Sequence, residues 1–192
     1  QMWGTVYDRT IVFSVDNKST VSLAGLAQPR IEPEICFRLK SSPPATRDPQ
    51  ALLACIEWIA HSVEIVQCHH PQWKVTIADC TADNGLHGRL VVGTPVAVER
   101  IAGLAAALPF LKVTLKKATE VKDQGVGSNV LGSPLLALAF LIELLEKQDE
   151  TLQPGEIITT GTLTDAHPVK PGETWSTDLH GFAAHGLEIT FE

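Results

Sequence analysis

The chain has 192 residues, of which 44% are hydrophobic and 19% are charged, and its formal net charge is -7 at pH 7. This composition is typical of a soluble globular protein of one domain. The acidic balance argues against a nucleic-acid partner, because phosphate recognition requires a basic surface. The longest apolar stretch, residues 135–145, is shorter than the ~20 residues that a membrane-spanning helix needs, so we expect no membrane partner.

The periodicity of apolar residues predicts many strands and two or three helices. In chain order, we expect a strand at 30–40, a helix at 48–61, strands at 62–67, 74–78, 89–92 and 112–117, a helix at 134–146, and strands at 156–164 and 187–191. Asp48-Pro49 and Ser133-Pro134 are good openings for the two helices, and residues 101–108 fit a short helix. Without regular alternation of helices and strands, this predicts an α+β fold, predominantly β, in a single domain spanning 1–192.

Two acidic residues share one face of the first predicted strand. Side chains alternate between the faces of a strand, so Glu32 and Glu34 lie on the face opposite Ile31 and Ile35. Glu64 has a similar setting between Val63 and Ile65. If the three carboxylates converge, they would suit a hard cation such as Mg²⁺, which prefers oxygen ligands. The alternatives are a solvated sheet face and, because of Pro33, an edge strand or bulge.

A second cluster of potential ligands is less suited to a metal. Cys68, His69 and His70 are followed by Cys80, but their spacing matches no common structural zinc pattern. None of the four cysteines, which include Cys36 and Cys55, fits a disulfide framework. We therefore expect reduced cysteines and a cytoplasmic protein.

Five motifs, in order along nearly the whole chain, resemble one family. They are Gln28-Pro29-Arg30-Ile31-Glu32-Pro33-Glu34-Ile35, Val63-Glu64-Ile65-Val66, Trp73-Lys74 through Ala82-Asp83-Asn84, Gly127-Ser128-Asn129-Val130-Leu131-Gly132-Ser133-Pro134, and Pro154-Gly155-Glu156-Ile157-Ile158-Thr159-Thr160-Gly161-Thr162. The chain resembles the 2-keto-4-pentenoate hydratase and 4-oxalocrotonate decarboxylase group of the fumarylacetoacetate hydrolase superfamily.

The resemblance implies a mixed β-roll with a few peripheral helices, and it assigns roles to residues. Glu32, Glu34 and Glu64 match the ligands of Mg²⁺ or Mn²⁺. The segment formed by Thr159, Thr160, Gly161 and Thr162 matches a substrate-binding loop, where glycine would let the backbone approach a ligand. Asp8 lies in a segment resembling the family's lid and is a candidate catalytic acid.

Other positions depart from the sequence pattern of this family. His87 stands where relatives have small polar residues, so it is a candidate proton shuttle, with a structural role as the alternative. Gln67-Cys68-His69 replaces an Asp-Ser-Arg sequence, and the family's Gly-Lys motif would lie upstream of Gln1. We therefore expect that the sequence lacks an upstream N-terminal segment.

The implied activity is hydration of a 2-hydroxy-2,4-dienoate or related 2-oxo acid through an enolate whose charge a divalent metal offsets. The alternatives are decarboxylation of a 4-oxalocrotonate-type acid, C–C hydrolysis of an acylpyruvate, and a non-catalytic metal-binding relative. The expected partners are the small-molecule substrate and further copies of the chain in a homo-oligomer.

Overall fold

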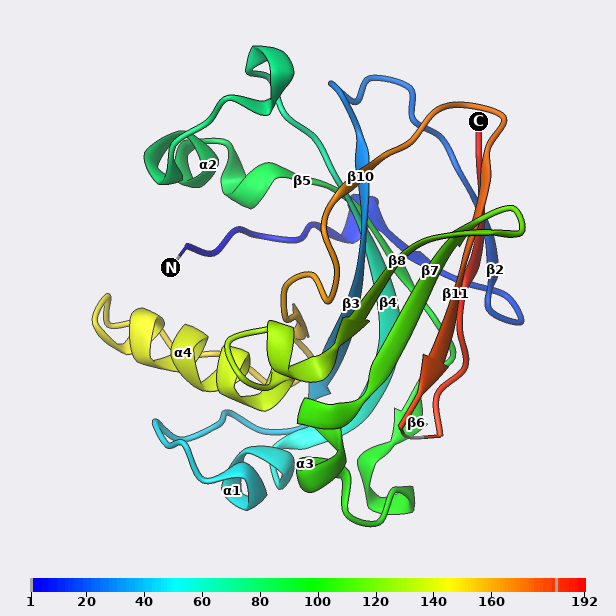
Figure 1. The fold of residues 1–192 in the computed structure, drawn as a ribbon. Coiled ribbons are helices and arrows are strands. Elements are labelled where there is room, and N and C mark those ends of the chain that lie inside the picture. Colours follow the sequence, from blue (N-terminus) through cyan, green and yellow to red (C-terminus); the bar gives the residue numbers. More distant parts are fainter. Residues whose placement is uncertain (1, 182) are drawn as a thin grey trace.

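A computed structural model describes residues 2–181 and 183–192, whose strands form two sheets (Figure 1). The seven-stranded sheet has the order β1-β5-β4-β3-β10, with β6 beside β4 and β9 beside β3, and the five-stranded sheet has the order β2-β12-β11-β7-β8. The strands are β1 (Ile11–Phe13), β2 (Lys18–Val21), β3 (Arg30–Leu39), β4 (Ile56–Val66), β5 (His87–Val92), β6 (Val96–Ala97), β7 (Lys112–Lys117), β8 (Glu120–Val126), β9 (Ile157–Thr159), β10 (His167–Pro168), β11 (Thr174–His180) and β12 (Glu188–Phe191).

Helices are fewer and mostly short. They are α1 (Pro49–Leu53), α2 (Ile77–Ala82), α3 (Leu104–Ala107) and α4 (Pro134–Glu146), with 3-10 turns η1 (Asp8–Thr10), η2 (Pro71–Trp73), η3 (Asn84–Leu86), η4 (Val98–Arg100), η5 (Leu108–Phe110) and η6 (Gly127–Asn129). In Figure 1, α2 and α4 lie on the opposite side of the molecule from β11 and β2. The predicted α+β fold with a dominant β component is confirmed.

One apolar cluster joins the two sheets. The seven-stranded sheet contributes Ile31, Val63, Ile65 and Val91, and the five-stranded sheet contributes Leu115, Trp175, Ile189 and Phe191. Because strand side chains alternate, Glu32, Glu34 and Glu64 lie on the face of the larger sheet that is turned away from this cluster. Packing of the two sheets therefore decides which face carries the acidic residues.

Helix α4 fills a second cluster, together with α1, α3 and the far part of β3. Ser133 is its N-cap and accepts a hydrogen bond from the amide of Leu135, with Pro134 in the first turn, as predicted. Counted with η6, the helical run covers 20 residues, Gly127–Glu146, and is longer than the apolar stretch at 135–145. Its length and hydropathy would suffice to cross a membrane. Its buried face, which includes Leu138 and Ile142, belongs to the protein core and accounts for this apolar composition.

The pairing of β3 with β4 is long and antiparallel. It runs from Arg30 opposite Val66 to Leu39 opposite Ile56, with one irregularity near its end. Pro33 lies inside β3, although proline cannot donate to a neighbouring strand. Its position is tolerated because β10 pairs only with the start of β3 and β9 only with residues 36–38, so Pro33 falls between them.

The predicted helix over 48–61 is wrong beyond its first turn. Asp48 caps α1 through the amide of Gln50, as expected, but α1 ends at Leu53 and β4 begins at Ile56. The spacing of Ile56 and Ile59, three residues apart, matches a helix. In β4 both residues still join one core cluster, because the pairing skips Glu57: Arg38 lies opposite Trp58, and Leu39 lies opposite Ile56. Pairing with β3 along the full length of β4 decides in favour of the strand, which β-branched residues also prefer.

The predicted strand over 74–78 is also wrong, because α2 begins at Ile77. Thr76 and Asp79 form a reciprocal capping box, in which each side chain accepts a hydrogen bond from the other residue's backbone amide. This signal, two polar residues three positions apart, was present in the sequence. The predicted strand over 156–164 is shorter than expected and covers only β9.

We predict that Leu138→Ala lowers the free energy of unfolding by ~2–5 kcal/mol, because it leaves a cavity in the core around α4. Urea denaturation measures this change. Ile77→Ala is the control, because Ile77 is a helical residue with 69% of its surface exposed, and its effect should stay within about 0.5 kcal/mol. Equal losses in the two variants would contradict the placement of α4.

Candidate functional site

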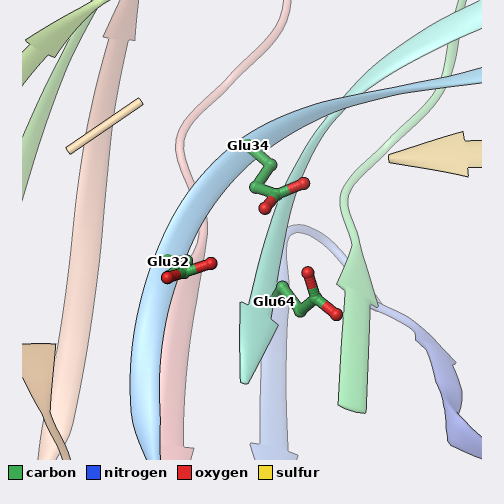
Figure 2. A group of neighbouring side chains, drawn as sticks. All are labelled: Glu32, Glu34 and Glu64. Carbon is green, nitrogen blue, oxygen red and sulfur yellow. The ribbon is translucent and has the colours of Figure 1, made fainter. Parts of the chain in front are cut away.

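Three glutamates from neighbouring strands converge on one face of the seven-stranded sheet (Figure 2). Glu32 lies directly opposite Glu64 in the β3–β4 pairing, and Glu34 lies two residues along β3 on the same face. One carboxylate oxygen from each of the three residues lies within 4.8 Å of the other two. The structure thus brings together the residues that the sequence predicted as metal ligands.

Burial and mutual repulsion make this cluster costly when it is ionised. Burial, with the nearby charge of Glu64, raises the pKa of Glu32 from its usual value to about 8, although Arg30 partly offsets this. Glu34 is 1% exposed, and burial together with the charges of Glu64 and Glu32 raises its pKa well above the ordinary range. The positive charge of a cation placed among the three oxygens would offset both causes of the shift.

The donor set fits a hard divalent cation. All three ligands are carboxylate oxygens, which Mg²⁺, Mn²⁺ and Ca²⁺ prefer. Two oxygens on one Mg²⁺ are at most ~4.2 Å apart, because each Mg–O distance is ~2.1 Å. The three oxygens lie within 4.8 Å of one another, so no separation exceeds this limit by more than ~0.6 Å.

Glu34 is held by the last residue of β9 and by the loop that follows it. The hydroxyl of Thr159 and the backbone amide of Gly161, at 2.9 Å, both donate to its Oε2 atom. Gly161 has a φ of +103°, a conformation that favours glycine. Thr160 donates instead to the backbone of β3, and Thr162 donates to the carbonyl of Thr164. The predicted substrate loop therefore lies beside the cluster and positions Glu34, and its contact with a substrate stays a prediction.

Glu64 is held by His87. The distance between Glu64 Oε1 and His87 Nδ1 is 2.6 Å, and His87 Nε2 is 2.7 Å from the hydroxyl of Thr10. The His87 side chain is only 4% exposed. With both ring nitrogens engaged, this geometry favours the structural alternative, in which His87 orients Glu64, over a proton shuttle.

A β-bulge in β5 turns the His87 side chain towards Glu64. In the pairing of β4 with β5, Arg89 lies opposite Ile65 and His87 lies opposite Val66, so Gly88 is the extra residue. A Cβ atom on Gly88 would lie 2.5 Å from the carbonyl oxygen of Ile65. The bulge therefore requires glycine, and the Gly-Leu-His-Gly sequence around His87 carried this signal.

His61, which the sequence analysis did not single out, connects the site to the other sheet. Its Nδ1 donates to the backbone carbonyl of Glu34 at 2.9 Å, and its Nε2 is 2.8 Å from the hydroxyl of Thr177 in β11. Burial lowers the pKa of His61 to about 4, although the hydrogen bond to Glu34 opposes the shift. His61 is thus neutral at physiological pH and fixes the backbone that carries Glu34.

Asp8, the candidate lid acid, begins η1 and is exposed. Within the described residues it has no hydrogen bond to the glutamate cluster, so its catalytic role stays a prediction. The segment before it is held by Asn84, whose side-chain amide accepts from the amide of Thr5 and donates to its carbonyl, at 2.7 and 2.8 Å. Asn84 therefore anchors the N-terminal segment to η3.

The second cluster of potential ligands does not assemble. Cys68 and Cys80 are buried free thiols, and His69 pairs with Asp83 at 2.8 Å. Within residues 2–181 and 183–192, the group of side chains that could hold a metal ion is the glutamate cluster.

Comparisons with known proteins agree with the geometry. The fumarylacetoacetate (FAA) hydrolase C-terminal model matches residues 6–189. The chain is 33% identical over 180 residues to a 2-hydroxyhexa-2,4-dienoate hydratase of Comamonas testosteroni, covering 91% of the chain and 66% of the relative. It is 32% identical over 174 residues to a 4-oxalocrotonate decarboxylase of Pseudomonas sp. (strain CF600), covering 90% and 64%.

A solved structure is similar over nearly the whole chain. It is the 4-oxalocrotonate decarboxylase from Pseudomonas putida G7 complexed with magnesium and adipate, with a TM-score of 0.86 and 28% identity over 98% of this chain and 69% of that one. The chain thus spans about two thirds of the length of the curated relatives it matches. By sequence, fold and the arrangement of its acidic residues, the chain belongs to the fumarylacetoacetate hydrolase family.

Proposed function

We propose that Glu32, Glu34 and Glu64 bind one divalent cation, Mg²⁺ or Mn²⁺, in a lyase that acts on a 2-oxo acid. The observation that carries the proposal is the convergence of three carboxylates from two paired strands. The similar decarboxylase solved with magnesium supports a divalent metal. When bound, the cation supplies positive charge that stabilises the developing enolate oxygen of the substrate.

The reaction that we favour is hydration of a 2-hydroxy-2,4-dienoate to a 4-hydroxy-2-oxo acid. Its support is the similarity to the 2-hydroxyhexa-2,4-dienoate hydratase. The protein's own contribution is to orient two of the three ligands: Thr159 and Gly161 hold Glu34, and His87 holds Glu64. Asp8 is our candidate for the proton transfer.

Decarboxylation of a 4-oxalocrotonate-type acid is the second candidate. The magnesium and adipate complex of a structurally similar decarboxylase favours it, and both reactions require charge stabilisation at the same oxygen. We also propose a homo-oligomer and a cytoplasmic location, the latter because the four cysteines are free and buried.

The activity test uses the full-length protein and follows a 2-hydroxydienoate by its ultraviolet absorbance. We predict turnover that EDTA abolishes and Mg²⁺ or Mn²⁺ restores. Glu64→Gln should reduce kcat/KM by at least ~100-fold, because it removes a ligand charge. The control Glu57→Gln changes an exposed glutamate of the same strand, paired with Arg38, and should retain activity. Full activity in Glu64→Gln would contradict the assignment, and product analysis separates hydration from decarboxylation.

The pH dependence of metal binding follows from the raised pKa of Glu32, about 8. Protons compete with the cation below this pKa, so we predict that Mn²⁺ raises Tm more at about pH 8.5 than at about pH 6. In EDTA, the folded protein retains protons that the unfolded chain releases above its usual pKa near 4.5. Stability of the metal-free protein should therefore fall as pH rises from that value to about 8.

The matched variant for this experiment is Glu32→Gln. Without metal at about pH 8.5 it should be more stable than the wild type by at least about 1 kcal/mol, because the buried charge is gone. It should also lose most of the Mn²⁺-dependent rise in Tm. A rise in Tm that does not depend on pH or on Glu32 would exclude this residue as a ligand.

We predict that His87→Ala weakens Mn²⁺ affinity by ~10–100-fold, as expected for a residue that orients a metal ligand. Electron paramagnetic resonance of free Mn²⁺ measures this affinity directly. His69→Ala is the control, because His69 also pairs with a carboxylate, that of Asp83, but outside the cluster. If the two variants bind Mn²⁺ equally well, His87 does not position Glu64 for binding.

A further inference from the structure

A cavity of about 370 Å³ is lined by His87, the residue that holds Glu64, but by none of the three glutamates. It is formed by η1 and the residue before it on one side and by the start of β5 on the other. Its walls include Tyr7, Arg9, Thr10, Gln67, His87 and Arg89. The cavity therefore combines two arginines with the histidine that holds Glu64.

The charge of the cavity is opposite to that of the whole chain. The protein carries a net charge of -7, yet the lining contains Arg9 and Arg89 and no aspartate or glutamate. Within the described residues, neither guanidinium group has a carboxylate within salt-bridge distance, whereas Arg38 and Arg47 do. Two arginines without acidic partners in a concave site create a local field that attracts an anion.

The hydrogen-bonding capacity that remains in the cavity is mainly that of donors. The Thr10 hydroxyl is bonded to the carbonyl of Tyr7 and to His87, and the Gln67 amide bonds to backbone groups at both ends. The Asn84 side-chain amide is hydrogen-bonded to the backbone of Thr5. The Arg89 guanidinium donates one N–H to the carbonyl of Gly88 at 2.8 Å, which fixes the direction of the guanidinium group. Its other four N–H groups remain available for a ligand.

We propose that this cavity binds the carboxylate group of a small organic anion through Arg89, with Arg9 as the second cation. Planar guanidinium groups match carboxylates and form charge-assisted hydrogen bonds with them. Arg89 is half-buried and Arg9 is exposed, so Arg89 is the principal anchor. A carboxylate in the cavity would pair the cationic groups that the chain itself leaves without an acidic partner.

The carboxylate has two sources. One is the far end of a dicarboxylate substrate whose oxo-acid end is at the glutamate cluster, and this source rests on the proposed function. The two sites share the His87 ring, which is 2.6 Å from Glu64 on one side and lines the cavity on the other. The other source is a free organic anion that occupies the cavity independently of metal.

The first experiment compares adipate with hexanoate, which has the same carbon chain but one carboxylate fewer. Binding to the Mn²⁺-loaded full chain is measured by calorimetry. If the cavity receives the far end of a substrate, adipate binds about tenfold or more tightly than hexanoate. Arg89→Gln should bring the two affinities close to one another, and Arg89→Lys should give an intermediate ratio because it keeps the charge but not the planar fork.

The second experiment titrates succinate into the protein in EDTA and in Mn²⁺. Equal, Arg89-dependent affinity in both conditions identifies a free anion as the occupant. Arg100→Gln is the control in each series, because Arg100 is exposed and lies outside the cavity lining. Unchanged Tm values establish that the variants are folded.

The proposal is overturned if Arg89→Gln and Arg9→Gln leave the adipate preference and the succinate affinity unchanged, or if the wild type shows neither. Failure of the proposed function has a different signature. In that case Mn²⁺ binding or dienoate turnover is absent, while Arg89-dependent binding of succinate in EDTA persists.

Discussion

The antiparallel pairing of β3 with β4 places Glu32 against Glu64 and keeps Glu34 on the same face. Like charges directly opposite one another destabilise a sheet, and burial increases the cost of ionising both carboxylates. This register persists because the opposite face of the same strands, with Ile31, Val63 and Ile65, is packed against the second sheet. A slip by one residue would turn the acidic side chains into the core and the apolar ones away from it. The hydrophobic core thus enforces an electrostatic repulsion that a cation can relieve.

Hydrogen bonds fix two of the three carboxylates of the cluster. Glu34 accepts from Thr159 and Gly161, and Glu64 bonds to His87. One holding group is the end of β9 with the residues that follow it, and the other is His87 at the start of β5, directly before the bulge at Gly88. Neutral His61 adds a connection from the Glu34 backbone to β11 of the other sheet. Ligands held in this way lose little conformational freedom on binding a cation, because their orientations are already set by packing and hydrogen bonding.

The acidic cluster and the basic cavity are built from different parts of the fold. Related proteins could therefore keep the same fold and metal ligands and still differ in substrate. In the proposed function the cluster holds the cation whose positive charge would stabilise an enolate oxygen, and it is built from the central strands β3 and β4. The cavity is built from the edge of the sheet and from the N-terminal segment, where η1 and β5 meet. Edge and loop residues are free to change without disturbing the core, whereas the ligand strands are constrained on both faces.

The sequence alone determined the dominance of strands, the capped helix α4, the strand β3 and the alternation that puts Glu32 and Glu34 on one face. These features depend on local spacing and on capping residues, which are readable without tertiary contacts. The sequence did not reveal the strand at 56–61, because the three-residue spacing of Ile56 and Ile59 matches a helix. Only pairing with the distant strand β3, with its irregularity at Glu57, decided it. The resemblance named Glu64 as a ligand, but spacing could not place it beside the other two glutamates. Its distance from Glu32 and the turn of His87 towards it depend on strand register and on one bulge, which are properties of pairing between segments far apart in the chain.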